Sequence, residues 1–283
     1  MLDLIKTIIL GIIEGLTEFL PISSTGHLIV ATALLQPFVS LASTPDGLAT
    51  LRNTFDIFIQ FGAIVALVAY YRKDIWTQVR TVRRDQQVQH FWIAIIVAFI
   101  PAAVLGLALR KFIENTLFSP VIVAISLIVG GILFLILERT IGQKETNEAD
   151  TMMDVTYRQA LIVGVVQVLS LIPGVSRSGA SIFGGMLSGL NRQTATRFSF
   201  FLAIPTLGAA TVVDLLLSLK DLHGSGAAYF AYLALGTIAA GVFAWIAVGW
   251  LLRYIAHNTF VPFGYYRIVA GIVILVLFAI AVL

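Results

Sequence analysis

Two polar motifs interrupt apolar stretches of this chain, and the first begins with a pair of acidic side chains. Glu14 and Glu18 are four residues apart, so on a helix both carboxylates lie on one face. A charge inside a membrane segment costs at least about 2.5–3.5 kcal/mol on insertion scales, so the pair needs a shared proton, a divalent cation or a cationic neighbour. The pair is therefore a candidate cation ligand or general base. Carboxylates that reach toward the surface from a short helix would give the same pattern.

The same motif continues with a run of hydroxyl side chains and an imidazole. Ser23, Ser24 and Thr25 are consecutive, and His27 follows after Gly26. Hydroxyl clusters are typical of helix caps and turns, and a lone histidine is most often structural. Together with carboxylates one to two turns away, however, they supply a nucleophile, a base and an orienting group. We expect this combination to be catalytic.

The second motif, residues 173–178, offers a fixed cation. Arg177 lies between Ser176 and Ser178, just after Gly174. A guanidinium binds phosphate oxygens in a bidentate way, and a following helix N-terminus favours an anion. The motif therefore predicts a phosphate site, with the alternative that Arg177 only neutralises the glutamates of the first motif. The two interpretations are compatible.

The composition indicates which kind of protein must position these motifs. Of 283 residues, 59% are hydrophobic and 12% charged, with no cysteine, whereas a globular domain has about 25% charged residues. Such a chain is neither water-soluble nor disordered, and it has no disulfide, thiolate metal site or cysteine nucleophile. Its basic residues lie in loops between apolar segments, which predicts membrane orientation and no nucleic acid binding.

Six segments are apolar and long enough to cross a bilayer, which needs about 20 helical residues. They are residues 54–71, 90–109, 118–138, 194–218, 228–252 and 263–283. Two further apolar stretches, 4–39 and 158–190, contain the polar motifs. Non-helical backbone at membrane depth persists only where protein or a wet cavity surrounds it. We therefore predict an all-α polytopic membrane protein with six full transmembrane helices and two re-entrant helix–loop–helix segments.

The two broken stretches also resemble each other. Residues 11–26 align without a gap to residues 164–179, and the matches include Gly11 with Gly164, Glu14 with Gln167, Ser23 with Ser176 and Thr25 with Ser178. Because three spans follow each stretch, the second unit must be inverted relative to the first, an arrangement that places a site where the breaks meet. We predict a single membrane domain, 1–283, with repeat one at 1–138, a cytoplasmic loop at 139–157 and repeat two at 158–283.

Basic residues predict the orientation. Six crossings divide the basic loop residues into sets of twelve and five, and Arg177 belongs to neither. The richer set belongs in the cytoplasm, so both termini are expected outside. The larger set is Arg72, Lys73, Arg80, Arg83, Arg84, Arg139, Lys144, Arg158, Arg192, Arg197, Arg253 and Arg267, and the smaller is Lys6, Arg52, Arg110, Lys111 and Lys220. Arg267 is thus expected near the cytoplasmic surface, and Asp214 is expected to reach toward the surface from the end of a span.

The residues from Glu14 to His27, taken with 173–178, resemble the two signature stretches of the bacitracin-resistance family of integral-membrane undecaprenyl-diphosphate phosphatases. The resemblance covers the whole chain. It implies removal of the terminal phosphate from undecaprenyl diphosphate, which regenerates the lipid carrier for bacterial cell-wall polymers. It also implies a divalent cation (Mg²⁺ or Ca²⁺), two inverted and interlocked repeats, and a site open to the outer side of the bacterial cytoplasmic (inner) membrane.

By motif match, the resemblance implies particular site residues. The catalytic set is Ser24, His27, Glu18, Glu14 and Arg177, with Glu14 and Glu18 as metal ligands. The expected substrate-binding set is Ser23, Thr25, Gly26, Gly174, Ser176, Ser178 and Ser181, the last standing where the family usually has threonine. The expected partners are a polyprenyl diphosphate lipid and membrane lipid, with the chain a monomer or homodimer.

The sequence leaves open the identity of the attacking group and the class of function. Ser24 could attack the terminal phosphorus, with His27 or a glutamate taking its proton, or water could attack directly while Ser24 binds phosphate. The competing class is a secondary transporter or lipid flippase, because inverted repeats and broken helices also characterise transporters and fold does not dictate function.

Overall fold

The computed structural model describes residues 2–38, 45–141, 151–218 and 227–283, and within them all regular secondary structure is helical. The α-helices are α1 (Leu2–Thr17), α2 (Ser24–Leu35), α3 (Pro45–Tyr70), α4 (Arg72–Thr81), α5 (Gln86–Phe112), α6 (Pro120–Thr140), α7 (Tyr157–Gln167), α8 (Arg177–Leu187), α9 (Arg192–Ser218), α10 (Ala227–Ile255) and α11 (Val261–Ala279). Three short turns of other helix types are η1 (Ile113–Leu117), η2 (Met152–Asp154) and η3 (Val168–Leu171).

Six of these helices are long and apolar enough to cross a membrane: α3, α5, α6, α9, α10 and α11. They coincide with the six predicted spans, although α3 begins at Pro45 rather than at residue 54. On α5, the apolar side chains of Ile96, Ile100, Val104 and Leu107 are each at least 50% exposed. A stripe of exposed aliphatic side chains at helical spacing is expected of a helix that faces lipid. The chain is a multi-pass membrane protein.

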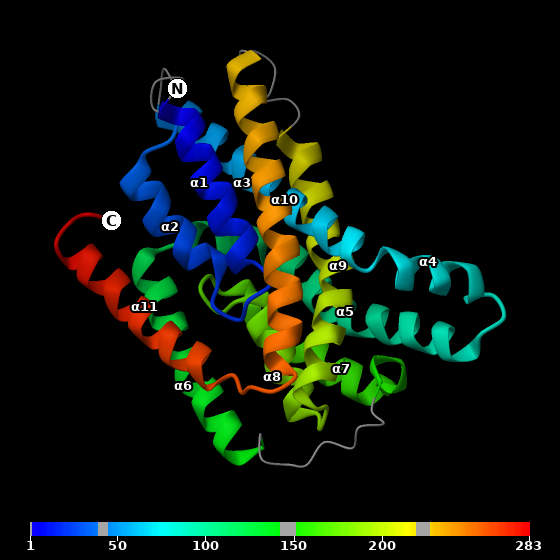
Figure 1. Ribbon diagram of the computed structural model, residues 1–283. Helices are drawn as coiled ribbons and strands as arrows, with labels where there is room; N and C mark the ends of the chain where they lie inside the picture. The colour runs from blue at the N-terminus through cyan, green and yellow to red at the C-terminus, as the bar shows by residue number, and fades with distance from the viewer. Residues whose placement is uncertain (1, 39–44, 142–150, 219–226) are drawn as a thin grey trace.

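The two remaining apolar stretches form pairs of short helices separated by turns, as predicted. In the first pair α1 ends at Thr17 and α2 begins at Ser24; in the second, η3 ends at Leu171 and α8 begins at Arg177. With 16 residues, α1 is about 24 Å long, which is shorter than the roughly 30 Å of a bilayer's hydrocarbon core. Both turns lie near the middle of the molecule (Figure 1).

The two turns end in the same unusual backbone conformation. Ser23 caps α2 with φ 69° and ψ 101°, and Ser176 caps α8 with φ 73° and ψ 121°. A positive φ is uncommon for a residue other than glycine and often marks a functional site. The Ser176 hydroxyl accepts a hydrogen bond from the backbone N–H of Gly179 at 3.1 Å, which stabilises the first turn of α8.

The helices pack so that the two broken segments are held between long spans. The long helix α10 (orange in Figure 1) runs beside α1 and α3, α6 packs along α11, and α5 packs on α7. Close approach of α1 to α10 depends on Gly11 and Gly15, because a Cβ at either position would overlap a backbone carbonyl oxygen of α10. Small residues at such crossings are typical of helix packing in membranes.

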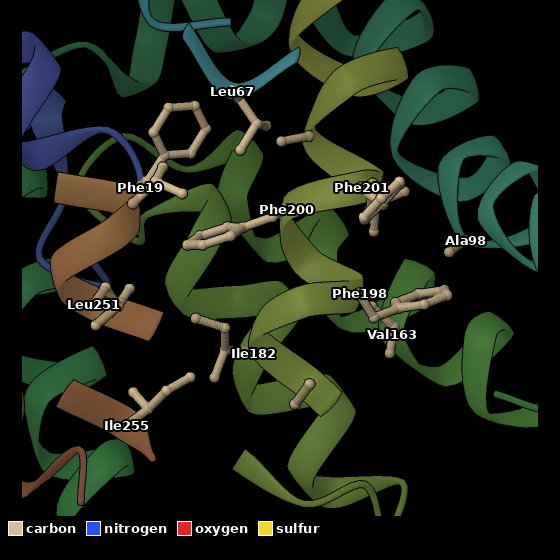
Figure 2. Close-up of a cluster of buried hydrophobic side chains, with 14 of the residues drawn as sticks. Phe19, Leu67, Ala98, Val163, Ile182, Phe198, Phe200, Phe201, Leu251 and Ile255 are labelled. Carbon is tan, nitrogen blue, oxygen red and sulfur yellow. The ribbon is translucent and has the colours of Figure 1, made fainter. Parts of the chain in front are cut away.

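A core of buried aromatic side chains surrounds α9 and reaches the first turn. Phe198, Phe200 and Phe201 are fully buried, and the ring of Phe19 meets that of Phe200 edge to face, with 5.6 Å between centroids (Figure 2). Since Phe19 directly follows Glu18, this contact fixes the turn after α1 against α9.

Two expectations are corrected by the structure and one is extended. Arg267 is fully buried rather than near the cytoplasmic surface. Asp214, near the end of its span, is one third exposed and pairs with Arg110 at 2.8 Å. The segment after the first span, expected as a loop, forms α4, which is too polar to be found by hydropathy. Lys144, Lys220 and most of the predicted loop 139–157 lie outside the described residues.

Candidate active site

Glu18 joins the two motifs. It lies just beyond α1, and its side chain is 7% exposed. Its Oε2 accepts a hydrogen bond of 2.7 Å from the hydroxyl of Ser24, and its Oε1 accepts one of 3.2 Å from the guanidinium of Arg177. One carboxylate therefore holds the candidate nucleophile and the candidate phosphate-binding cation in a single cluster.

A second contact fixes the motifs to each other through the backbone. The Ser178 hydroxyl donates to the carbonyl oxygen of Leu20 at 2.9 Å, and it lies 3.0 Å from the hydroxyl of Ser176. The turn that carries Leu20 has left the helical path, so its carbonyl groups need partners from elsewhere. The Ser178 hydroxyl of the second motif thus supplies a hydrogen-bond donor to a carbonyl group of the first turn. The two motifs lie side by side, as the sequence predicted.

Arg177 is positioned with part of its hydrogen-bonding capacity unused. Its side chain is 8% exposed, and besides Glu18 it donates to the carbonyl oxygen of Ser199 at 3.2 Å. The face of Phe19 lies 5.6 Å from the guanidinium carbon. Its Nε has no hydrogen-bond partner in the described part of the chain. A buried, unpaired N–H on a guanidinium is suited to an oxygen of a bound anion.

These side chains line a cavity of about 490 Å³. The polar wall contains Glu18, Ser23, Ser24, Thr25, Gly174, Ser176 and Arg177. The remaining wall comes largely from α5 and α9 and is mostly apolar, with Phe99, Ala102, Leu107, Leu207, Ala210 and Val213. The Arg110–Asp214 ion pair also borders the cavity, and each of its side chains is about one third exposed. The cavity therefore offers a charged end and an apolar wall to one ligand.

His27 and Gly26 lie on a different cavity. This second cavity, of about 440 Å³, is bordered by α1, α2, α6 and α11 and is largely apolar. The His27 ring stacks on Tyr266 with 5.6 Å between centroids, and its Nε2 is hydrogen-bonded to the Tyr266 hydroxyl. Its Nδ1 donates to the carbonyl oxygen of Ser23 at 2.7 Å. His27 thus contacts the backbone of the hydroxyl run rather than the Ser24 side chain.

Ser181 also points away from the charged cluster. Its hydroxyl donates to the carbonyl oxygen of Arg177 at 2.9 Å and lies 2.6 Å from the hydroxyl of Ser199. The first bond lies within α8, and the second connects α8 to α9. The position of Ser181 fits a role in holding Arg177 rather than in touching a ligand.

The carboxylates partly meet the needs of a divalent cation. Glu14 is buried one turn before Glu18, and its Oε2 has no hydrogen-bond partner among the described residues. Hard cations prefer carboxylate oxygens, so the pair fits part of a coordination set. Within the described residues, no group of three or more acidic or histidine side chains is placed to bind a metal. Phosphate or water oxygens would have to complete the set.

Sequence reasoning did not assign to the site several residues that border or support these cavities. Among them are Arg110, Asp214, Tyr266 and Arg267. The clearest signal was Arg267, which lies inside a predicted span and between two glycines, Gly264 and Gly271. A charge within a transmembrane segment indicates a buried partner by default.

The fold and the cluster define a class: a multi-pass helical membrane protein whose broken helices bring a carboxylate, a hydroxyl and a guanidinium to one internal cavity. Comparison with known proteins specifies the family. Residues 7–273 match the family described as bacitracin resistance protein BacA, and the chain belongs to it.

Curated relatives are similar over nearly their whole length. An undecaprenyl-diphosphatase of Thermoanaerobacter sp. (strain X514) is 44% identical over 98% of this chain and 97% of its own. The undecaprenyl-diphosphatase of Deinococcus radiodurans is 42% identical over 100% of this chain and 98% of its own. The undecaprenyl-diphosphatase of Albidiferax ferrireducens is 46% identical over 96% of this chain and 94% of its own.

Proposed function

We propose that the protein hydrolyses undecaprenyl diphosphate to undecaprenyl phosphate and inorganic phosphate. Its relatives are named for this activity at 41–46% identity. The observation that carries the proposal is the Glu18 carboxylate, which accepts hydrogen bonds from both Ser24 and Arg177 in the cavity. Phosphoryl transfer asks a protein mainly for positioning and charge stabilisation, and this cluster supplies both.

In the proposed mechanism Ser24 is the nucleophile. Glu18 takes the hydroxyl proton along the existing 2.7 Å hydrogen bond while the Ser24 oxygen bonds to the terminal phosphorus. The bond from that phosphorus to the bridging oxygen breaks, and undecaprenyl phosphate leaves with the electron pair. Water then hydrolyses the phosphoserine to inorganic phosphate and free Ser24. Arg177 stabilises the charge on the terminal phosphate through its unpaired Nε and its terminal nitrogens.

The remaining predicted residues have supporting roles in this proposal. Ser23, Thr25, Gly174 and Ser176 border the cavity and would contact the diphosphate, while Ser178 and Ser181 hold the turn and Arg177 in place. His27 and Gly26 shape the start of α2. Glu14 and Glu18 would hold Mg²⁺ or Ca²⁺, which would supply neutralising charge for the diphosphate oxygens.

We further propose that the fold consists of two inverted repeats, 1–138 and 158–283, joined by the loop 139–157, with α1–α2 and α7–α8 as re-entrant pairs. The matching backbone angles of Ser23 and Ser176 support this proposal. The packing supports it too, because α1 packs on α10 as α7 packs on α5, its counterpart in the other unit. Each broken segment is thus held by a helix of the opposite repeat, as interlocked units require.

The proposed location is the bacterial cytoplasmic (inner) membrane, with both termini outside. Removing buried Arg267 from the count of cytoplasmic basic residues leaves eleven against five, so the bias remains. Arg110 belongs to the outer set and borders the cavity, which therefore opens outward in this orientation. The side chains of the cluster all come from one chain. A monomer would therefore suffice for the activity, and each subunit of a homodimer would contain its own complete site.

Phosphate release from a short-chain prenyl diphosphate in detergent tests the proposal, because no gradient exists there to drive transport. Wild type should release phosphate, and chelation of divalent cations should abolish the release until Mg²⁺ or Ca²⁺ is restored. Ser24→Ala should lose about 10³-fold or more in kcat and should no longer trap labelled phosphate covalently.

Ser119→Ala is the matched control, because Ser119 caps α6 outside the cavity cluster. A Ser24→Ala variant with wild-type release would contradict the nucleophile. Release by Arg177→Ala at the wild-type rate would contradict the phosphate-binding role of Arg177. Absence of release by wild type would contradict the enzyme itself and favour the transporter alternative.

A further inference from the structure

Arg267 is a buried cation whose hydrogen bonds go to the backbone of both turns. It lies on α11 and has no exposed surface. Its NH1 donates to the carbonyl oxygen of Pro21 at 3.1 Å, and its NH2 donates to those of Gly174 and Val175 at 3.2 and 2.9 Å. Longer contacts of 3.4 and 3.5 Å reach the carbonyl oxygens of Ser126 and Leu127 on α6.

The surroundings of Arg267 are built to accept a guanidinium without a counterion. No carboxylate pairs with it in the described part of the chain. A buried charge is strongly unfavourable unless its N–H groups are satisfied, and here carbonyl dipoles take the place of an anion. Gly130 leaves the space, because a Cβ there would overlap the NH2 nitrogen. The Phe134 ring lies 5.9 Å from the guanidinium carbon.

The bonded carbonyl groups stand close in sequence to the reacting side chains. Pro21 precedes Ser24 by three residues, and Gly174 and Val175 precede Arg177 by three and two. Both turns have left the helical path, so their carbonyl groups have no partner within a helix. The planar guanidinium of Arg267 therefore fixes the turn before Ser24 relative to the turn before Arg177.

We propose that Arg267 is a positioning residue that sets the distance between Ser24 and Arg177 by tying the turn 18–23 to the turn 172–176. The kinetic part of this inference rests on the proposed phosphatase activity, whereas the structural part does not. The planar guanidinium carries five N–H donors in a fixed geometry, whereas a lysine ammonium carries three on a flexible stem. Lysine therefore cannot bridge both turns and α6 together.

The experiment measures kcat, KM and local hydrogen exchange for Arg267→Lys and Arg267→Ala. Displacement of reacting groups by about 1 Å costs roughly 100-fold in rate, so kcat should fall about 100-fold in both variants, with a smaller change in KM. Amide exchange should rise in both turns, 18–23 and 172–176, and stay at the wild-type rate in α3 and α10. Free guanidinium at a non-denaturing concentration should restore activity to Arg267→Ala but not to Arg267→Lys, whose side chain fills the space.

Arg253→Lys and Arg253→Ala are the matched controls. Arg253 lies near the end of α10 and donates to Gly249 within its own helix, so these variants should behave as wild type. Gly130→Ala is the independent variant if the Arg267 variants do not fold. Its new methyl group displaces the guanidinium but retains the charge, so it should raise exchange in the same two turns. Gly208→Ala, which meets nothing within 4 Å, is its control.

The outcomes separate this inference from the proposed function. Wild type without phosphate release would remove the proposed function and leave the exchange measurement to decide the role of Arg267. Wild-type exchange in either turn of a folded Arg267→Lys variant would overturn the inference. So would a uniform rise in exchange across α3, α10 and the turns, because that result indicates a general contribution to stability.

Discussion

At the scale of single residues, the division of labour between Glu18 and Glu14 follows from their partners. Both oxygens of Glu18 already accept hydrogen bonds, one from Ser24 and one from Arg177. Glu14 has one oxygen without a hydrogen-bond partner in the described residues, and it is 2% exposed, compared with 7% for Glu18. Glu18 is therefore suited to take a proton from Ser24, and Glu14 has the coordination capacity for a cation. The acidic pair is one sequence motif with two different environments.

His27 provides a prediction at this scale. An asparagine side chain can place its amide N–H where the imidazole Nδ1 donates to the Ser23 carbonyl oxygen, so His27→Asn should keep the start of α2 in place. We expect less than a tenfold loss of kcat, whereas removal of a general base costs about 10²–10⁴-fold. The measurement is phosphate release by His27→Asn, His27→Ala and wild type over a range of pH.

His27→Ala should be the slower of the two variants, because it removes the contact to Ser23. A loss of 10²-fold or more in His27→Asn, together with a changed pH profile, would assign proton transfer to the imidazole and not to Glu18.

At the scale of helices, the close approach of α1 to α10 determines where Glu14 and Glu18 lie. Gly15 directly follows Glu14 in sequence, and its Cα faces the backbone of α10 at Ala240 and Ala244. The backbone-to-backbone contact presses one face of α1 on α10. The face that carries the acidic side chains is therefore not packed on α10, and Glu18 borders the cavity.

Gly15→Ala should therefore destabilise the fold. The added Cβ would overlap the carbonyl oxygen of Ala240, and overpacking of this kind costs about 1–3 kcal/mol. Gly208→Ala on α9 makes the same chemical change where nothing lies within 4 Å, so it should leave stability equal or raised by up to about 1 kcal/mol. Thermal unfolding in detergent, followed by circular dichroism, measures both; equal melting temperatures for the two variants would contradict the close packing of α1 on α10.

The helices show which features could be predicted from the sequence and which could not. Spans were predictable because hydropathy and length are local properties, and the breaks were predictable because Pro21, Pro173 and Gly174, which disfavour a continued helix, stand beside runs of small hydroxyl residues. Proline alone was not sufficient, because Pro101 and Pro205 lie inside α5 and α9. The partners of Arg267, and the pairing of Arg110 with Asp214, join elements about a hundred residues or more apart. No local pattern encodes such pairings, so the surface position assigned to Arg267 was wrong and the ion pair of Asp214 was not foreseen. The amphipathic helix α4 was missed because hydropathy detects only apolar segments.

At the scale of the whole molecule, the proposed repeat is symmetric in backbone and asymmetric in chemistry. Gln167 stands at the position of Glu14, is fully buried, and contacts Thr206 at 3.5 Å. Arg177 stands opposite Ser24 in the aligned motifs. One half thus supplies the carboxylate and hydroxyl groups of the cavity and the other supplies the cation, and the proposed mechanism uses this difference.

The proposed orientation is tested with single cysteines, because the natural chain has none. Arg84→Cys places a thiol at an exposed position between α4 and α5, on the proposed cytoplasmic side. Val282→Cys places one at a 39% exposed position beside the C-terminus, on the proposed outer side. A membrane-impermeant maleimide should label Val282→Cys in intact cells and Arg84→Cys only after permeabilisation. The cysteine-free parent is the control for background labelling, and phosphate release confirms that each variant is folded. The reverse labelling pattern would place the opening of the cavity at Arg110 in the cytoplasm, so that an outward-facing diphosphate could not reach Ser24.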